Sequence, residues 1–144
     1  MTIASVLREK GNTIVSVQPN TPVISIVATM SSRRIGAVLV LDEAGTLEGI
    51  ISERDVVKTL AQHGLHIHTM QATDIMTRAV TTVTPKTSIN HAMELMDKGY
   101  FRHLPVVDDG ALVGIISVRD VVRARIERQD DEAQSLRSYI NFRS

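Results

Sequence analysis

The 144-residue sequence contains no cysteine and no tryptophan, and its only aromatic residues are two tyrosines and two phenylalanines. Without cysteine the chain forms no disulfide, no thiolate zinc site and no thiol nucleophile. So few rings disfavour a platform that stacks on the bases of a nucleic acid. Because hydrophobic residues nevertheless make up 43% of the chain, we expect a core of valine, isoleucine, leucine and methionine.

The chain also lacks net charge and long apolar runs. Lysine and arginine together number 16, as do aspartate and glutamate, so no overall field draws it to nucleic acid or an acidic membrane. No apolar run reaches the roughly 18 residues of a membrane-spanning helix. Ile3, Val6 and Leu7 have helical spacing but no signal-peptide pattern follows them. We therefore expect a soluble, cytoplasmic protein with no membrane contact.

What the sequence does contain is an internal repeat. The segment GIISERDVV at 49–57 recurs as GIISVRDVV at 114–122, with Val118 in place of Glu53. The two segments start 65 residues apart (114 − 49 = 65). Two copies with this period indicate a duplicated domain that pairs with itself, because a solenoid needs more copies of a shorter unit. Five further positions match at an offset of 66: Pro19, Thr21, Met30, Val40 and Asp42 with Pro85, Thr87, Met96, Val106 and Asp108.

Each copy is predicted to begin with a strand followed by a helix. Residues 13–17 alternate as in a strand. Thr21 precedes Pro22, which predicts a helix capped by Thr21 with proline at its first position. The helix has apolar residues at i, i+3, i+4 and i+7, namely Val23, Ile26, Val27 and Met30 in the first copy and Ile89, Ala92, Met93 and Met96 in the second.

Two strands and a second helix complete each copy. Residues 37–41 and 47–51 flank a glycine-containing hairpin loop, and 108–110 form a shorter loop in the second copy. Ser52 and Ser117 start the second helices, and Gly64 ends the first of them. The expected buried stripes are Val56, Val57 and Leu60 in one helix and Val121, Val122 and Ile126 in the other.

The predicted order of parts is an N-terminal helix (1–12), a first repeat (13–64), a linker (65–78), a second repeat (79–128) and a helical tail (129–144). The linker contains a short capped turn at 73–76. In the tail, Ala133, Leu136 and Ile140 have the spacing of an amphipathic helix, which covers an exposed face or contacts a second subunit.

The repeated Ser-x-x-Asp has a simple structural explanation. Serine at a helix N-cap followed three residues later by an acid is close to a capping box, and both Ser52 with Asp55 and Ser117 with Asp120 fit it. A cap does not explain the arginine inside each turn, Arg54 or Arg119, or the aliphatic run before it.

The motif Gly-hydrophobic-hydrophobic-Ser-x-Arg-Asp, at the end of a duplicated β-α-β-β-α unit, resembles the CBS domain, whose tandem pair is called a Bateman module. Asp-Ile-Met-Thr at 74–77 and Phe-Arg-His-Leu-Pro-Val-Val-Asp at 101–108 are similar to further signatures of that family. The likeness runs from Thr13 to about Ile126 and is to stand-alone, bacterial-type CBS domain proteins. It implies an α+β fold in which the two repeats pack with pseudo-two-fold symmetry into one module.

The resemblance implies a regulatory module that binds AMP, ADP, ATP or NAD(H) in clefts between the repeats, with no catalytic cofactor. An aspartate can accept hydrogen bonds from two ribose hydroxyls, while serine and helix N-terminal amides meet phosphate. One implied pocket combines Ser117, Arg119 and Asp120 with Thr13, Ile14, Ile35, Gly36 and Ala37. The other combines Ser52, Arg54 and Asp55 with Ala79, Val80, Phe101, Arg102 and His103.

The two implied pockets differ in charge, because Arg102 and His103 stand where the first repeat has Gly36 and Ala37. Arg102 is a planar donor suited to phosphate; taken alone it would be interpreted as a solvated charge at a strand edge, but its place in this repeat favours phosphate contact. Arg33 and Arg34 suit the end of a helix without any ligand.

Two other groups invite a functional interpretation that we set aside. His63, His66 and His68 lie around a linker without a fourth ligand, so we interpret them as solvated loop histidines and expect no metal site. Met30, Met93 and Met96 are expected to pack in the core.

The hypothesis is therefore a sensor that binds an adenine nucleotide and signals to a protein effector that the sequence does not identify, and that forms a homodimer through exposed helix faces. An RNA-binding or scaffolding module is the alternative. An enzyme is disfavoured, since the sequence shows no GxSxG motif, no metal-ligand cluster and no supported acid and base pair.

Overall fold

The computed structural model describes residues 1–143, with the backbone alone for Tyr139 and residues 141–143; Ser144, at the end of the predicted tail, lies outside the described residues. The chain separates into two compact units, which we call the first-repeat unit (13–81) and the second-repeat unit (1–12 and 82–144). Each unit contains its own cluster of buried hydrophobic side chains.

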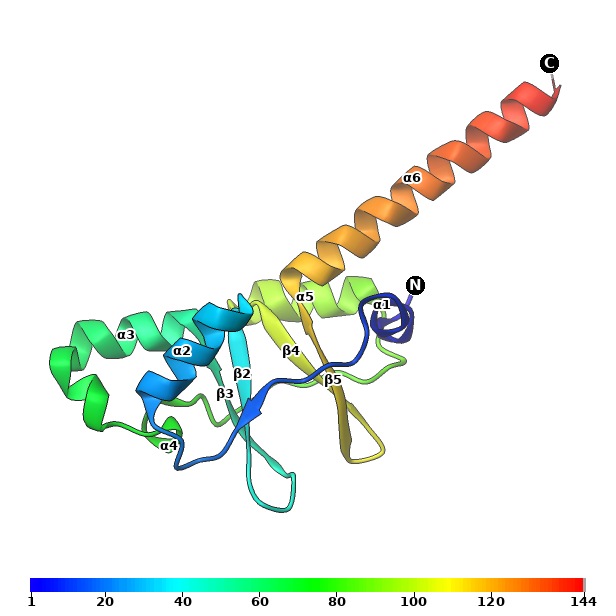
Figure 1. Ribbon diagram of the computed structural model, residues 1–144. Helices are drawn as coiled ribbons and strands as arrows, with labels where there is room; N and C mark the ends of the chain where they lie inside the picture. Colours follow the sequence, from blue (N-terminus) through cyan, green and yellow to red (C-terminus); the bar gives the residue numbers. More distant parts are fainter. Residues whose placement is uncertain (144) are drawn as a thin grey trace. The chain divides into compact units, whose positions relative to one another are not determined.

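The first-repeat unit is a three-stranded sheet with helices, shown in blue to green in Figure 1. The sheet order is β1-β2-β3, with β1 parallel to β2 and β2 antiparallel to β3. A parallel pair needs a crossover, and the helix between β1 and β2 supplies it. The elements are β1 (Ser16–Val17), α2 (Val23–Arg33), β2 (Ala37–Leu41), β3 (Leu47–Ser52), α3 (Glu53–His63), a 3-10 helix η1 (Gly64–Thr69) and α4 (Ala72–Ile75).

The second-repeat unit is built on an antiparallel pair of strands, β4 and β5. The hairpin loop is Asp109-Gly110, whose two positive φ angles, 51° and 79°, are those of a type I′ turn. The first strand expected in this copy is reduced to one parallel bridge, Val83 with Val106. The elements are α1 (Ile3–Lys10), α5 (Ile89–Gly99), β4 (His103–Asp108), β5 (Ala111–Ser117) and α6 (Val118–Arg143).

The apolar faces predicted for α2 and α5 are largely confirmed. Val23, Ile26 and Met30 of α2 are buried, as are Ile89, Ala92 and Met96 of α5. In β2 four successive residues, 37–40, are buried, which shows that both faces of this strand are covered.

A short helix that lies just before one repeat in the sequence completes the unit of the other repeat: α4 belongs to the first-repeat unit and α1 to the second-repeat unit. The sequence did not reveal this role. The backbone N–H of Ala72 in α4 donates to the Thr21 carbonyl at 2.8 Å, and that of Ile3 in α1 donates to the Thr87 carbonyl at 2.9 Å. Thr21 and Thr87 are matched positions of the repeat, and Ala72 and Ile3 are both fully buried. The two helices are therefore structural counterparts, although they were predicted as parts of a separate N-terminal helix and a linker.

The glycine that starts each GIIS segment lets these helices pack against the strand. A Cβ on Gly49 would lie 2.8 Å from Met76 Sδ and 2.8 Å from the Thr77 carbonyl oxygen. A Cβ on Gly114 would lie 2.8 Å from Leu7 Cδ2. Leu7 thus takes the place in the second-repeat unit that Met76 takes in the first.

Three local predictions need correction. The strand expected over 13–17 is limited to β1, residues 16 and 17. Pro22, in an extended conformation, is the N-cap of α2, so the helix begins one residue later than predicted. The Thr21 hydroxyl instead accepts a hydrogen bond from the Gln18 N–H at 3.0 Å. The predicted turn at 73–76 is the helix α4, which begins earlier, after the capping residue Gln71.

The buried stripes predicted for α3 and α6 are mostly wrong. Val57 and Leu60 are 64% and 48% exposed, and Val122 and Ile126 are 43% and 52% exposed. Val121 is buried and Val56 packs against the hydrophobic cluster of its unit, as expected, whereas Met93, assigned to the core with the other methionines, is 38% exposed. Periodicity shows which side chains share a helix face, but it does not show which face a neighbour covers.

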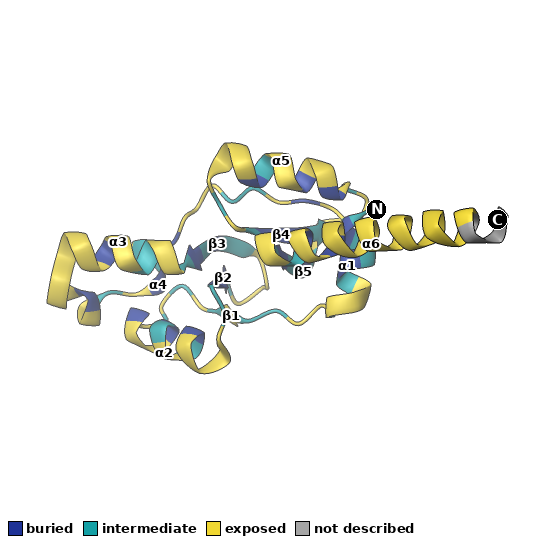
Figure 2. Ribbon diagram, turned by 90° about the horizontal axis from the view of Figure 1, so that it is seen from above, coloured by how far each residue is buried: buried dark blue, intermediate teal, exposed yellow. Residues whose placement is uncertain are grey.

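The helix that begins after Ser117 and the predicted tail form one continuous helix, α6, which extends away from β4, β5 and α5 of its own unit (Figure 1). Every side chain described from Glu127 onward is exposed, as the yellow ribbon in Figure 2 shows. Over the described residues, α6 included, no helix is both long and apolar enough to cross a membrane.

Candidate ligand-binding site

In the first-repeat unit, Ser52 and Asp55 form a capping box at the start of α3. The Asp55 N–H donates to Ser52 Oγ at 3.4 Å, and the Ser52 N–H donates to Asp55 Oδ2 at 2.8 Å. The Thr77 hydroxyl, from the segment after α4, donates to Asp55 Oδ1 at 3.4 Å. The carboxylate of Asp55 is therefore half-buried and held by hydrogen bonds on both oxygens.

In the second-repeat unit, Ser117 and Asp120 make the same arrangement at the start of α6. The Ser117 N–H donates to Asp120 Oδ2 at 2.8 Å, and the Asp120 N–H donates to Ser117 Oγ at 3.2 Å. The capping explanation of both Ser-x-x-Asp motifs is thus confirmed. It accounts for one oxygen of each carboxylate and leaves room for further contacts, since a carboxylate has about four acceptor positions.

Lys10, at the end of α1, makes an ion pair with Asp120. Its Nζ donates to Asp120 Oδ2 at 2.7 Å and to the Ile115 carbonyl at 2.8 Å. The side chains of Lys10 and Asp120 are 30% and 16% exposed, so water screens the pair only in part. Burial by itself raises the pKa of Asp120, but the hydrogen bond and charge of Lys10, together with the hydrogen bonds from Ser117, outweigh burial and hold the pKa below its usual value.

The two aspartates therefore have different donors from equivalent segments. Asp120 faces the ammonium of Lys10, whereas Asp55 faces the neutral hydroxyl of Thr77. The sequence did not point to Lys10, because matched positions in α1 and α4, such as Leu7 and Met76, lie 69 residues apart (76 − 7 = 69) and not 65 or 66 as within the repeats. The match between Leu7 and Met76 becomes visible only in the structure, so the sequence held no signal that pointed to Lys10.

Each helix start also lies beside the residue that precedes β2 in the first-repeat unit or β4 in the second-repeat unit. The Glu53 N–H donates to the Gly36 carbonyl at 3.0 Å, and the Val118 N–H donates to the Arg102 carbonyl at 2.8 Å. Ala37 pairs with Ser52 across the sheet, and His103 pairs with Ser117 in the same way. These contacts confirm that Gly36-Ala37 and Arg102-His103 are matched positions.

Each predicted pocket draws on both units. The first-repeat unit holds Ser52, Arg54 and Asp55 with Thr13, Ile14, Ile35, Gly36, Ala37, Ala79 and Val80, and the second-repeat unit holds Phe101, Arg102, His103, Ser117, Arg119 and Asp120. Ile35 and Phe101 pack against the hydrophobic clusters, while Arg54, Arg102 and Arg119 are exposed. The combination of residues from different units into two pockets stays a prediction.

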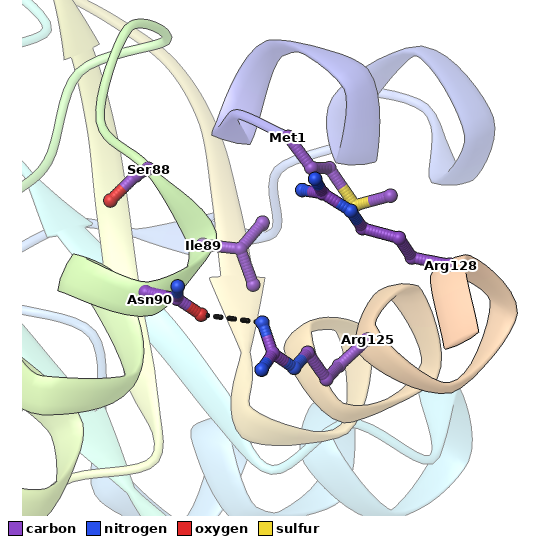
Figure 3. Close-up of a pocket in the computed structure, with 6 residues that line it drawn as sticks. All are labelled: Met1, Ser88, Ile89, Asn90, Arg125 and Arg128. Carbon is purple, nitrogen blue, oxygen red and sulfur yellow. Dashed lines mark hydrogen bonds between the residues drawn. The ribbon is translucent and has the colours of Figure 1, made fainter. Parts of the chain in front are cut away.

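A small hollow in the second-repeat unit lies apart from these residues (Figure 3). It measures about 90 Å³ and is lined by Met1, Ser88, Ile89, Asn90, Arg125 and Arg128. Arg125 Nη1 donates to Asn90 Oδ1 at 2.8 Å across it. Because ligand pockets usually measure about 300 to 1,000 Å³, this hollow is too small for a nucleotide.

The linker histidines show no metal-binding arrangement. Nδ1 of His68 is hydrogen-bonded to the Leu65 carbonyl. Over residues 1–143 there is no group of three or more histidine, aspartate or glutamate side chains that could hold a metal ion.

Comparison with known proteins identifies the family. The CBS domain model matches residues 11–62 and 72–127, so the chain belongs to the CBS domain family as a tandem pair. A mitochondrial CBS domain-containing protein of Arabidopsis thaliana, CBSX3, is 34% identical over 96% of this chain and 71% of its own length.

Solved structures agree with this assignment. The CBS-domain containing protein ATU1752 from Agrobacterium tumefaciens has a TM-score of 0.84 and 37% identity, covering 86% of this chain and 92% of that one. The CBS domain pair of MJ0100, solved with 5′-methylthioadenosine and S-adenosylmethionine, has a TM-score of 0.79 and 26% identity, and CBSX2, solved with AMP, has 0.72 and 28%. Each of these two alignments covers 89% of this chain and 98% of the other.

Proposed function

We propose that the protein is a regulatory sensor that binds an adenosine-type ligand through Asp120 and Asp55. The observation that carries this proposal is the pair of helix starts in which serine and aspartate are fixed in the same geometry in both repeats. Solved CBS pairs similar to this chain hold AMP, 5′-methylthioadenosine or S-adenosylmethionine. All three share adenine and a ribose with vicinal hydroxyls, the group that a carboxylate recognises.

The chemistry of the two helix starts suits a nucleotide. The capping bond occupies Oδ2 of Asp120, so Oδ1 can accept the ribose hydroxyls without breaking the cap. The N-terminal turn of α6 adds a partial positive charge. Lys10 adds a full positive charge next to the carboxylate, which favours a ligand with a phosphate group.

In the full proposal, two pockets form from the combinations given above, one around Asp120 and one around Asp55. Arg102 supplies a phosphate donor to the Asp55 pocket, as Lys10 does to the Asp120 pocket. The ligand is AMP, ADP, ATP or NAD(H), and its occupancy is passed to a protein effector in the cytoplasm by a change in shape or dimer geometry. Catalysis is not part of the proposal.

The test is calorimetry of the full-length protein with AMP, ATP, NAD and S-adenosylmethionine. Replacing Asp120 with alanine is expected to weaken binding by about 1.5 to 3 kcal/mol, or roughly tenfold to over a hundredfold, the scale of hydrogen bonds to a charged group. Asp55→Ala tests the other pocket in the same way. Asp74→Asn is the matched control, because Asp74 caps α4 outside the repeated motif.

The proposal fails if no adenosine compound binds the folded protein, or if Asp120→Ala and Asp55→Ala both bind as tightly as the original chain. In that case the repeated turns serve only to start helices. An RNA-binding or scaffolding function would then be the remaining hypothesis, and a salt-dependent shift of RNA mobility would support the former.

We also propose a homodimer, because apolar side chains remain exposed on the helix faces. Val57 and Leu60 lie on α3, and Val122 and Ile126 lie on α6. Exposed apolar patches of this kind mark interaction surfaces in soluble proteins. Sedimentation that gives a monomer at micromolar concentration would contradict the dimer and leave the ligand proposal standing.

A further inference from the structure

Residues 122–140 of α6 present an apolar stripe that repeats every three and four residues. Four of its six members are large hydrophobic residues that are 43% to 60% exposed. Steps of four, three, four, three and four residues are the a and d positions of a heptad repeat. In order, with d first, the members are Val122, Ile126, Gln129, Ala133, Leu136 and Ile140.

All six members of this stripe are exposed. From Glu127 to Ser138 every residue of α6 is exposed, and the helix runs outward from the unit (Figures 1 and 2). At its inner end the stripe joins an open hollow of about 530 Å³, whose lining on α6 is Val118, Arg119, Val122, Arg123, Ile126 and Glu127. An isolated amphipathic helix is only marginally stable in water, so this one is expected to have a partner.

The charges beside the stripe indicate what the partner is. In a parallel coiled coil the g residue of one helix meets the e residue five positions later on the other. Here Arg125 and Glu132 occupy g, and Asp130 and Arg137 occupy e. A second copy of the same helix, parallel and in register, therefore gives Arg125 with Asp130 and Glu132 with Arg137. Both pairs have opposite charges, and each occurs twice in the dimer.

Two of these side chains already have partners on their own chain. Arg125 donates through Nη1 to Asn90, and Glu132 accepts from Arg128 at 3.3 Å. Both side chains can form further hydrogen bonds, since a guanidinium has five donors and a carboxylate has about four acceptor positions. The charge complementarity is therefore available to a second chain.

We infer that the outer part of α6, residues 122–140, forms a parallel two-stranded coiled coil with the same segment of a second copy of this chain. Ile126 and Ile140 at a, with Leu136 at d, are the combination that favours two strands. Gln129 at d places one polar layer in the seam. The seam is about 28 Å long. Because it is short, the dimer is expected to dissociate when the protein is diluted. This inference rests on the proposed dimer and gives it an orientation.

The first test measures the monomer–dimer equilibrium of the full-length chain by sedimentation. Leu136→Asp introduces a charge into the seam and is expected to raise the dissociation constant about tenfold or more. Ser135→Asp, on the adjacent face of the same helix, is the matched control and should change it less than about threefold. Equal effects of the two substitutions would overturn the inference.

The second test uses charge reversal. Glu132→Arg alone and Arg137→Glu alone each place like charges opposite one another and weaken the dimer. The double variant restores opposite charges and is expected to recover most of the original affinity. If the double variant is weaker than both single variants, the predicted pairing is wrong.

A disulfide crosslink can determine whether the two α6 helices are parallel or antiparallel. Because the chain contains no cysteine, a single introduced cysteine is the only thiol. Leu136→Cys places two thiols opposite one another in a parallel, in-register seam, at a separation a disulfide can bridge. Oxidation should then give a covalent dimer that binds ligand as the reduced protein does. An antiparallel pair would keep the thiols about 15 Å apart and give no crosslink, which would overturn the parallel arrangement.

The outcomes separate this inference from the function proposed above. A dimer that persists unchanged in every α6 variant supports association through other helix faces and overturns the coiled coil. Loss of ligand binding in Asp120→Ala bears on the sensor alone, since Asp120 lies outside residues 122–140.

Discussion

The most informative perturbation is the replacement of Lys10 by methionine, which keeps the length of the side chain and removes its charge. Lys10 Nζ lies 2.7 Å from Asp120 Oδ2. If Asp120 holds the ribose, the 5′-phosphate lies on the order of 7 Å from the ammonium. Unit charges at that distance attract by about 0.6 kcal/mol in bulk water and about 1.2 kcal/mol at an effective dielectric constant of about 40.

A phosphate monoester carries a charge of about −1.5 to −2 near pH 7, so the expected loss is about 1 to 2 kcal/mol, or roughly five- to thirtyfold. This loss of binding free energy applies to AMP and not to adenosine, which has no phosphate. The decisive quantity is therefore the ratio of the two dissociation constants, because removal of Lys10 also releases Asp120 from its ion pair.

Calorimetry with AMP and adenosine measures this ratio for the original chain and for three variants. Lys10→Arg should preserve the ratio, since it retains the charge. Lys86→Met, which removes an exposed lysine of the same unit, should leave both affinities unchanged. An equal change in AMP and adenosine affinity on Lys10→Met would refute the electrostatic reasoning.

Three further predictions concern stability and the second pocket. Gly49→Ala should lower the free energy of unfolding by about 1 to 3 kcal/mol and Gly114→Ala by less, because the added Cβ meets the Thr77 backbone in the first case and only a movable Leu7 side chain in the second; urea unfolding that ranks them oppositely would contradict this. The pKa of Asp120 is lowered in the folded state, so its stabilisation is present above the unfolded pKa and is lost as the pH falls through the folded pKa, below 3.8. Unfolding measured from pH 6 to pH 2 should therefore show a steeper acid loss in the original chain than in Lys10→Met, and parallel curves would be evidence against the ion pair. Arg102→Ala should weaken AMP about tenfold with little effect on adenosine if Arg102 meets phosphate in the Asp55 pocket, and an unchanged AMP affinity would remove it from that role.

Local features of the fold could be predicted where neighbouring residues determine them. Alternation and turn chemistry located β2 and β3, and the Asp109-Gly110 loop, with its positive φ angles, located the second hairpin. Ser52 and Ser117 begin helices as their capping motifs require. In each of these cases the physical cause lies within a few positions of the residue itself.

Features that depend on distant contacts could not be predicted in this way. Lys10 reaches a carboxylate 110 positions later in the chain, and no local pattern indicates that contact. The exposure of Val57 and Leu60 depends on which helix face a neighbour covers, which the spacing of apolar residues leaves open. The counterpart relation of α1 and α4 was hidden because their sequences share little beyond apolar spacing.

The position of α1 has a consequence for the order of folding. The first-repeat unit is contiguous, so a growing chain can complete it as soon as residue 81 has been synthesised. Helix α1 precedes the first repeat in the sequence, but its hydrogen-bonding partners are Pro85 and Thr87, so it can pack only after they have been synthesised. Until then Ile3 and Val6 remain without their hydrophobic neighbours in that cluster. Closure of the second-repeat unit thus joins two segments that lie on either side of the first-repeat unit in the sequence.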